Sequence, residues 1–262
     1  MKPYYQDEYV TLYCGDCREL LPTIPANSID IMFTDPPYGH NNNDGDLIHN
    51  WEKALGKAKP GIVEEARPIA NDGMEEMKSV VDFALVEAAR FLKKDRCCCC
   101  CCCSGGGGPR PTFAWLANRM DEKGLSFFHA VVWDKGGLGM GWMYRRNYEM
   151  VMVAHRKNGK MKWEWKGNGK ETANVVRIGK IIPTAKDHPT PKPTALVEHF
   201  LQLHGKPGDI VIDPFMGAGT TIVAAKNLGL KSIGCELDEH WCEVTAKRLS
   251  QGVLPLWEKE EN

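Results

Sequence analysis

Residues Ile210 to Asp238 read IVIDPFMGAGTTIVAAKNLGLKSIGCELD, and this stretch decides the fold. A short apolar strand, Ile210 to Ile212, leads into a glycine turn and a helix, and a second strand ends at Glu236. Strand, glycine turn, helix, strand and acidic residue, in this order, are typical of a nucleotide-binding βαβ unit, in which the acidic residue accepts the ribose hydroxyls. The alternative interpretation is a plain βα turn built from small residues.

The glycine turn itself narrows the class of nucleotide. It contains Gly217 and Gly219, but it lacks the third glycine of the dinucleotide pattern and the Lys-Ser/Thr pair of a P-loop. Because those features hold the phosphates of NAD and ATP, their absence argues against both ligands. The spacing from Gly219 to Glu236 is close to the ~20 residues expected between such a turn and its acidic residue.

A second motif, Asp35-Pro36-Pro37-Tyr38, follows an apolar run from Ile29 to Phe33 that predicts a buried strand. The carboxyl ends of strands are where open α/β sheets bind ligands. Two prolines fix φ and remove two N–H donors, which leaves a stiff turn with a carboxylate, carbonyl oxygens and an aromatic ring. Such a turn suits a planar group with an exocyclic amine; a proline-stiffened surface turn is the alternative.

Together the two motifs resemble those of the DNA amino-methyltransferases that use S-adenosylmethionine. The DPPY sequence resembles the catalytic motif of that family, and Asp213 to Thr221 resembles its FxGxG cofactor motif. The order, with the catalytic motif first, resembles the circularly permuted β class. The resemblance implies an α/β, Rossmann-like class I methyltransferase fold: a mostly parallel sheet with helices on both faces and an antiparallel strand near its edge. It also implies a single catalytic domain over residues 1–262.

The resemblance further implies which residues act. Asp35 and the carbonyl of Pro36 would accept hydrogen bonds from the target amine, and Tyr38 would stack on a base flipped out of the duplex. The implied cofactor is S-adenosylmethionine, held at its ribose by Glu236 and near its adenine by Asp16. The other implied cofactor-binding residues are Asp35, Lys192, Asp213, Phe215, Gly217, Gly219 and Thr220. The segment Asn147-Tyr148-Glu149 resembles the motif beside the target base, and no metal is implied.

The identity of the target base rests on Asp35, because family members that methylate cytosine N4 often have SPPY in place of DPPY. Aspartate therefore favours adenine N6, with cytosine N4 as the alternative. Methylation of RNA or of a protein glutamine is a weaker alternative, since those enzymes often have asparagine first in the motif. A DNA-binding protein with an inactive site is a further one, against which stand the intact residues Asp35, Tyr38, Gly217, Gly219 and Glu236.

The charge of the chain is segregated, although its net value is only −1. Residues 135–192 hold 13 lysines and arginines against 4 acidic residues, a net charge of +9, so the rest of the chain carries −10. This pattern predicts a basic face that follows the phosphates of double-stranded DNA, with ordinary solvated surface as the alternative. Within it, residues 156–190 are the candidate target-recognition segment. Residues 40–72 form a long candidate active-site or DNA-binding loop.

The size of the recognition segment bears on assembly. A segment this short covers only a few base pairs, and members of the β class often pair, so a homodimer is expected. The sequence has no run of about 18 apolar residues and starts without an apolar signal region, so neither a membrane span nor a secretory signal is predicted. A reducing, cytoplasmic setting in a bacterium or encoded by a phage is expected.

Seven consecutive cysteines, Cys97 to Cys103, form the least usual part of the chain. Side chains of a strand alternate between faces, so no more than about four thiolates could share one side. Cysteine zinc sites usually combine C-x₂₋₄-C pairs from separate segments. A helix near residues 75–92 and a turn at Lys93 to Asp95 precede the run. A buried central strand is therefore favoured over a metal or redox centre, which is the alternative.

Overall fold

The computed structural model of the chain describes residues 1–39, 73–103, 112–137, 145, 147–164, 172–181 and 192–250. The candidate active-site or DNA-binding loop, residues 40–72, lies outside the described residues. So do residues 165–171 and 182–190 of the candidate target-recognition segment. The described ranges include both sequence motifs, Asp35 to Tyr38 and Asp213 to Thr221.

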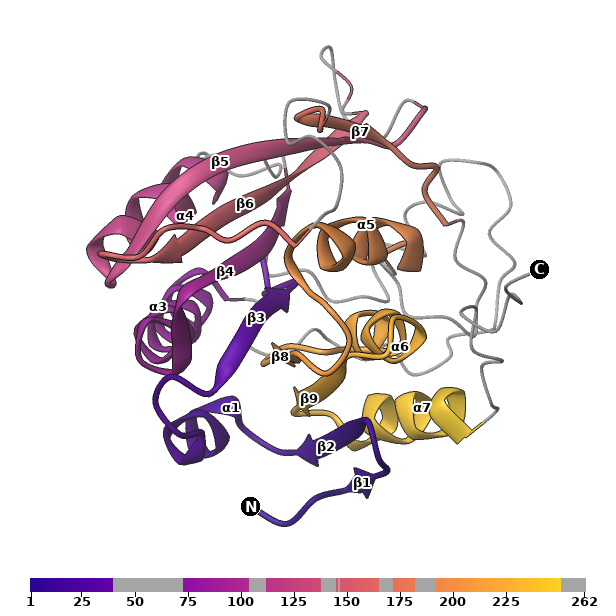
Figure 1. Ribbon diagram of the computed structural model, residues 1–262. Helices are drawn as coiled ribbons and strands as arrows, with labels where there is room; N and C mark the ends of the chain where they lie inside the picture. The colour runs from indigo at the N-terminus through magenta and orange to yellow at the C-terminus, as the bar shows by residue number, and fades with distance from the viewer. Residues whose placement is uncertain are drawn as a thin grey trace, which may run out of the picture.

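A mixed β-sheet runs through the centre of the molecule (Figure 1). In the described ranges its nine strands are β1 (Tyr5–Gln6), β2 (Val10–Cys14), β3 (Ile29–Thr34), β4 (Leu92–Cys103), β5 (Leu125–Asp134), β6 (Tyr148–Arg156), β7 (Val175–Arg177), β8 (Ile210–Asp213) and β9 (Lys231–Glu236). Their order is β1-β2-β9-β8-β3-β4-β6-β5-β7. Neighbours from β2 to β4 pair in parallel, whereas β1 and β6 are antiparallel to their neighbours. The mostly parallel sheet that the sequence predicts is confirmed.

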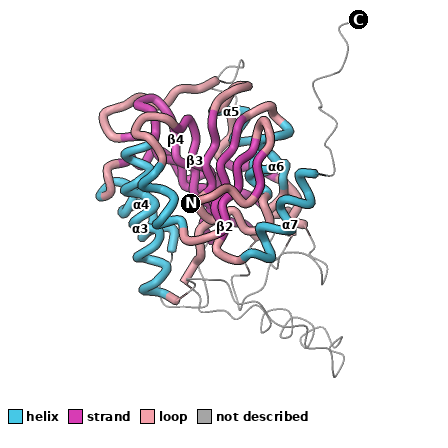
Figure 2. Tube along the Cα trace, turned by 90° about the horizontal axis from the view of Figure 1, so that it is seen from below, coloured by secondary structure: helices cyan, strands magenta, loops and turns pink. Residues whose placement is uncertain are grey.

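Helices cover both faces of this sheet, also as predicted. They are α1 (Cys17–Leu20), the 3₁₀ helix η1 (Leu21–Thr23), α3 (Met74–Phe91), α4 (Thr112–Glu122), α5 (Thr194–His204), α6 (Thr220–Asn227) and α7 (Glu239–Ser250). Figure 2 shows α3 and α4 on one side of the strands and α6 and α7 on the other. Helix α5 packs beside α6. Among the helices of the described residues, none combines the length and the apolar character that a membrane span needs.

The neighbouring strands β3 and β8 mark the place where the connections change direction. From β8 the chain passes through α6 to β9, whereas after β3 it continues to α3 and to β4 on the opposite side. Open α/β sheets bind their ligands beyond the carboxyl ends of the strands at such a switch point. Asp35 follows β3 and Asp213 ends β8, so both motifs meet at this place.

The cysteine run forms the second half of β4, which lies between β3 and β6. Its side chains alternate: Cys98 and Cys100 pack in the core under α3 and α4, whereas Cys97, Cys99 and Cys101 pack in the core under α5. All five are at most 1% exposed. The prediction of a buried central strand is confirmed, because cysteine here replaces aliphatic side chains on both faces.

The predicted turn at Lys93 to Asp95 is wrong, because these residues are extended and belong to β4. Pairing with β3 jumps from Ile29 opposite Leu92 to Ile31 opposite Cys97, so the intervening residues form an irregular bulge. The cause is Asp30, which is 1% exposed and needs positive partners. Lys93 Nζ lies 2.7 Å and Arg96 Nε 3.1 Å from its carboxylate, and reaching it keeps the strand extended.

Candidate active site

Four predicted site residues lie at the carboxyl ends of adjacent parallel strands. Asp16 follows β2, Glu236 ends β9, Asp213 ends β8 and Asp35 follows β3. Hydrogen bonds join these ends: Thr34 Oγ1 donates to Asp213 Oδ1 over 2.6 Å, and the backbone N–H of Gly15 donates to the carbonyl of Glu236 over 2.8 Å. The structure therefore brings the two sequence motifs into one site, although they are far apart along the chain.

The glycine turn has the backbone conformation that its sequence requires. Gly217 and Gly219 have φ angles of 49° and 76°, in the left-handed region that favours glycine. A Cβ atom at Gly219 would lie 2.3 Å from Cγ2 of Thr245 in α7, so no larger residue fits there. The turn ends at Thr220, the first residue of α6, and it follows β8, which pairs with β9.

Asp213 anchors this turn from the end of β8. Its Oδ1 atom accepts from Thr34 and from the backbone N–H of Phe215, the latter over 3.1 Å. The side chain is only 2% exposed, and burial raises the pKa of its carboxyl group to about 6. A carboxylate with a raised pKa at a switch point is the kind of group that marks functional sites.

The carboxylate of Glu236 is fixed by two backbone donors. Its Oε2 accepts from Gly217 N and its Oε1 from Asp238 N, each over 2.9 Å. Burial raises the pKa of this carboxyl group. Because a carboxylate offers about four lone-pair sites, two remain for the hydroxyls of a ligand. The donors orient Glu236 beside the glycine turn, as a βαβ nucleotide site requires.

Asp16 lies beside Glu236 but is held by local partners. Its Oδ1 accepts from Arg18 N over 2.9 Å, which caps α1, and its Oδ2 pairs with the Arg18 guanidinium at 2.5 Å. The hydrogen bonds from Arg18 lower the pKa of Asp16. This carboxylate is thus ionised and oriented at the end of β2, next to the strand that carries Glu236.

The second half of the site surrounds Asp35. Lys192 Nζ donates to Asp35 Oδ2 over 2.6 Å and to the hydroxyl oxygen of Tyr38 over 3.0 Å. The Tyr38 hydroxyl donates to Asp35 Oδ1, and the Lys192 ammonium lies 5.3 Å from the centre of the Tyr38 ring. Burial and the nearby charge of Asp35 raise the pKa of Tyr38 well above its usual value. Pro36, the residue after Asp35, is buried.

Lys192 thus lies at the catalytic motif, whereas the sequence interpretation grouped it with the cofactor-binding residues. Its side chain is 8% exposed, and Glu149 Oε2 lies 3.4 Å from its Nζ atom. Burial alone would lower the pKa of Lys192, but the carboxylates of Asp35 and Glu149 outweigh it and raise the pKa. The ammonium ion is therefore a fixed charge of the site.

Glu149 was predicted to lie beside the target base as part of Asn147-Tyr148-Glu149, but the sequence interpretation assigned it no role of its own. It lies near the start of β6, and Lys135 Nζ donates to its Oε1 over 3.0 Å. Burial would raise the pKa of this carboxyl group, but the charges of Lys192 and Lys135 outweigh it and lower the pKa. The signal in the sequence was an acidic residue directly before the apolar run of a central strand, within a motif already assigned to the target base.

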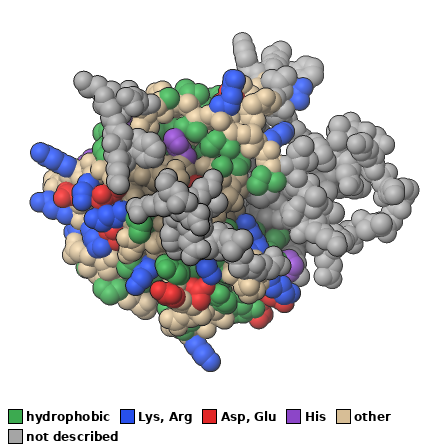
Figure 3. Space-filling model, turned by 45° about the vertical axis from the view of Figure 1, so that its right-hand side comes forward, with side chains coloured by type: hydrophobic (Ala, Val, Ile, Leu, Met, Phe, Trp, Pro, Cys, Tyr) green, Lys and Arg blue, Asp and Glu red, His purple; other side chains and the backbone are tan. Residues whose placement is uncertain are grey.

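The basic segment, residues 135–192, does not present all of its charge to solvent. Lys192 and Lys135 both pair with Glu149 inside the site. Arg177 pairs with Asp134 at 2.8 Å, although its own side chain is 80% exposed. On the face shown in Figure 3, lysine and arginine side chains lie among acidic ones in the coloured part of the surface. The single basic face stays a prediction.

The sequence matches the protein-family model for N6/N4 methyltransferases, described as DNA methylase, over residues 29–248. The chain belongs to this DNA methylase family. The match begins with the DPPY strand, β3, and ends in α7 beyond the glycine turn, so it contains both halves of the site. The resemblance drawn from the two motifs is confirmed.

Two curated relatives cover nearly all of this methylase. The type II methyltransferase M2.LlaDCHI of Lactococcus lactis subsp. cremoris is 25% identical, over 96% of this chain and 93% of the relative. The type II methyltransferase M.HinfI of Haemophilus influenzae is 28% identical, over 96% of this chain and 71% of the relative.

Solved structures share the fold. The complex of M1.HpyAVI with S-adenosylmethionine has a TM-score of 0.65 at 22% identity, over 92% of this chain and 98% of that one. The cytosine-N4-specific PvuII DNA methyltransferase has a TM-score of 0.71 at 21% identity, over 94% of this chain and 88% of that one. The class I methyltransferase fold predicted from the sequence is thereby confirmed.

Proposed function

We propose that this methylase transfers a methyl group from S-adenosylmethionine to the exocyclic N6 of adenine, in a short sequence of double-stranded DNA and with the base flipped out. Membership of the DNA methylase family establishes the coarser activity, methylation of an exocyclic amine. The observation that carries the finer proposal is the carboxylate of Asp35, fixed beside the glycine turn by Lys192 and Tyr38. A carboxylate oriented in this position can accept hydrogen bonds from an amine that must lose its planarity to react.

The residues of the glycine turn fit S-adenosylmethionine, the ligand in the similar structure of M1.HpyAVI. Glu236 has two carboxylate lone-pair sites left for the ribose hydroxyls, and Asp16 lies beside it for the adenine end. The turn that would hold the methionine part of the cofactor includes Asp213, Phe215, Gly217, Gly219 and Thr220. When bound, the sulfonium group supplies the methyl group.

The DPPY turn would prepare the target amine for attack. An exocyclic amine is a poor nucleophile, because its lone pair is delocalised into the ring. Hydrogen bonds from its two N–H groups to Asp35 and to the carbonyl of Pro36 would localise that lone pair. The Tyr38 ring would stack on the base, a contact worth about 1–3 kcal/mol. The remaining task is positioning, since the reacting atoms must approach to about 3–3.5 Å.

Lys192 and Glu149 support this arrangement from the protein side. The ammonium ion of Lys192, 2.6 Å from Asp35, orients that carboxylate, and Glu149 keeps the ammonium ion in place. Both oxygens of Asp35 already accept one hydrogen bond each, from Lys192 and from Tyr38. The target amine would therefore use the remaining lone pairs, or displace the hydroxyl of Tyr38 as the ring turns to stack.

Methyl transfer to DNA tests the proposal directly. The purified protein is incubated with S-adenosylmethionine and bacterial DNA, and the digested nucleosides are identified by mass spectrometry. We expect N6-methyladenine. Cytosine N4 is the second candidate, because the PvuII enzyme shares the fold, and N4-methylcytosine as the product would refute the adenine assignment. The Asp35→Ala variant should transfer no methyl group, and its equilibrium affinity for S-adenosylmethionine separates the two roles assigned to Asp35: an affinity within a few fold of the wild type assigns the residue to the target amine rather than to the cofactor.

The same proposal extends to the organisation of the chain. Residues 1–262 would form one catalytic domain, in which residues 156–190 read the DNA sequence and residues 40–72 serve as an active-site or DNA-binding loop. A domain of this kind would read its sequence in double-stranded DNA as a homodimer. Methylation-site mapping in host DNA by single-molecule sequencing, with segment 156–190 exchanged for that of a relative, should change the recognised sequence but not the methylated base. An unchanged recognition sequence would assign target recognition elsewhere.

A further inference from the structure

One cluster of side chains has no role in methyl transfer as described above. Cys97, Cys99 and His204 each offer one metal-binding atom, and these three atoms lie within 4.8 Å of one another. The three residues are 1%, 0% and 2% exposed. In the described part of the chain, no other group of three or more cysteine, histidine or acidic residues has this geometry. Cys98 and Cys100, on the opposite face of β4, approach to 3.5 Å but have no third ligand there.

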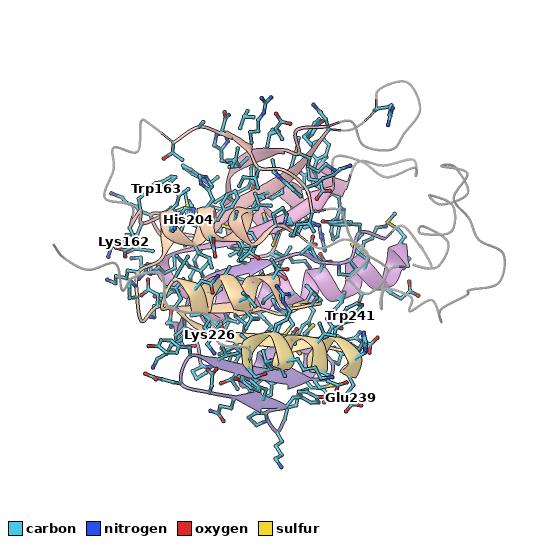
Figure 4. All side chains as sticks on the ribbon, turned by 90° about the vertical axis from the view of Figure 1, so that its right-hand side faces the viewer. Lys162, Trp163, His204, Lys226, Glu239 and Trp241 are labelled. Carbon is cyan, nitrogen blue, oxygen red and sulfur yellow. The ribbon has the colours of Figure 1, made fainter. Side chains whose placement is uncertain are left out.

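The fold fixes these residues in place. Cys97 and Cys99 are two positions apart on β4, so their side chains share the face that α5 covers. His204 is the last residue of α5, and its carbonyl accepts from Arg96 Nη1 over 3.1 Å. The ring of Trp163 packs on the ring of His204 with centroids 5.0 Å apart, and Figure 4 shows the two side chains together. Contacts with Arg96 of β4 and with Trp163, in the loop after β6, therefore hold His204 in place.

The ring of His204 interacts with the Cys97 thiol and with the backbone of Lys162, yet one of its two nitrogens lacks a hydrogen bond of normal geometry. Its Nδ1 atom is buried and has no hydrogen-bond partner among the described residues. Buried polar atoms are nearly always satisfied, so an orphan of this kind needs an explanation. An imidazole nitrogen is a common metal ligand, and one ring nitrogen of His204 lies within 4.8 Å of the sulfur atoms of Cys97 and Cys99.

We propose that Cys97, Cys99 and His204 bind a thiophilic metal ion, Zn(II) or Cu(I). Two sulfur donors and one imidazole nitrogen, without a carboxylate in the set, suit these ions rather than Mg²⁺ or Ca²⁺. Bond lengths of about 2.3 Å to sulfur and 2.0 Å to nitrogen would separate the donor atoms by roughly 3.3–3.8 Å. Since the donor atoms lie within 4.8 Å of one another, the cluster would need to contract by about 1.5 Å at most. Binding releases the two thiol protons to solvent.

The position of the cluster indicates a structural role. The ion would join the carboxyl end of α5 to β4, the central strand that packs beside β3. The amino end of the same helix follows directly after Lys192 and Pro193. Clamping α5 on the sheet therefore fixes the helix whose entry carries the cation bound to Asp35. Because the clamp stabilises the folded chain, loss of the ion should lower the melting temperature.

Metal content tests the proposal on the full-length protein. Cells are grown with added zinc or copper, and the protein is purified under reducing conditions and passed over a chelating resin. Mass spectrometry should find one ion per chain, and X-ray absorption at the metal edge should show two sulfur and at least one nitrogen neighbour. The ion should be lost from Cys97→Ser, Cys99→Ser and His204→Asn. It should stay in the matched control Cys98→Ser/Cys100→Ser, on the other face of the strand.

Three results would overturn it. The first is wild-type protein that retains neither ion after the resin. The second is metal lost equally from the control variant, which would indicate general binding by the cysteine run. The third is an absorption spectrum without sulfur neighbours. If the ligand variants do not fold, the wild-type spectrum and the control variant still distinguish a site at Cys97, Cys99 and His204 from general binding by the cysteine run.

Discussion

Asp35 illustrates what a single residue can and cannot reveal in the sequence. Its place after an apolar run predicted a carboxylate at the end of a strand, and the structure has it there. Its partner Lys192 lies 157 positions away, and the contact between them depends on how α5 meets the sheet. No local pattern encodes such a contact. For the same reason, the ion pair between Lys192 and Glu149 could not be predicted.

The ring of Tyr38, rather than its hydroxyl group, should carry its function. Tyr38→Phe removes a hydroxyl that in this structure bonds to Asp35 and Lys192, and leaves the stacking ring in place. We expect kcat/KM for DNA to stay within a few fold in this variant. Tyr38→Ala loses a stack worth about 1–3 kcal/mol, so kcat/KM should fall by roughly 5- to 150-fold. Steady-state methyl incorporation into the same DNA measures both.

A phenylalanine variant as inactive as the alanine variant would contradict this assignment. The hydroxyl group, as a ligand of Asp35, would then be the part of Tyr38 that catalysis requires. Val86→Ala serves as a control, because its side chain is 47% exposed on α3 and belongs to neither motif.

At the scale of elements, most of the fold could be predicted from the sequence. Apolar runs and glycine turns gave β3, β8, β9 and α6 to within a residue or two, because buried strands and helix starts have local signals. The exception at Lys93 to Asp95 has a physical reason: charged residues suggest a turn unless a buried partner lies across the sheet. Asp30 is that partner, and only the structure reveals its burial. Strand β7 is only three residues long, Val175–Arg177, which is too short for a periodic pattern, and it was not predicted.

Asp213, at the end of β8, should lower the free energy of unfolding when its buried carboxyl group is ionised. Burial raises the pKa of Asp213 to about 6, above the value of about 3.9 in an unfolded chain. The folded chain holds this proton more tightly than the unfolded chain, so ionisation is less favourable in the folded state. The contribution of Asp213 to the free energy of unfolding should therefore fall as pH rises from about 4 to about 6, and stay low above that range.

Replacement by asparagine tests this pH dependence. The amide oxygen of Asp213→Asn can still accept from Thr34 and Phe215 N, while the buried charge is removed. Without cofactor, the variant should be more stable than the wild type by on the order of 1–3 kcal/mol at pH 7.5, and the difference should vanish near pH 4. Urea unfolding at the two pH values measures it. A gain of equal size at both would show that the charge of Asp213 is not its cause.

At the scale of the whole molecule, the charge pattern bears on DNA binding. Lys160 and Lys162 belong to the basic segment and lie in the described part after β6, whereas Lys166 lies outside the described residues. Each phosphate neutralised contributes about −0.9 to the slope of log affinity against log salt on duplex DNA. Replacing all three lysines by glutamine should reduce the magnitude of this slope by up to about 2.7. Fluorescence anisotropy over a range of salt concentrations measures the change.

The matched control replaces three lysines outside the basic segment, Lys78, Lys231 and Lys247. These lie on α3, β9 and α7, and their removal changes the net charge by the same amount. An equal change of slope in both variants would mean that net charge, rather than the basic segment, governs DNA affinity. An unchanged slope in the first variant would remove its lysines from the contact surface.

The last prediction concerns the assembly that a short recognition segment requires. Residues 156–190 can contact only a few base pairs, and each mismatched pair costs about 1–3 kcal/mol, so one copy discriminates only weakly among the sites of a genome. A homodimer would let one subunit hold DNA while the other methylates it. Light scattering at micromolar concentration should therefore give twice the mass of the 29.3 kDa chain without DNA, and that mass plus the mass of the bound duplex with DNA. A monomer in both conditions that still methylates one defined sequence would refute the pairing, because a single copy would then supply all of the specificity.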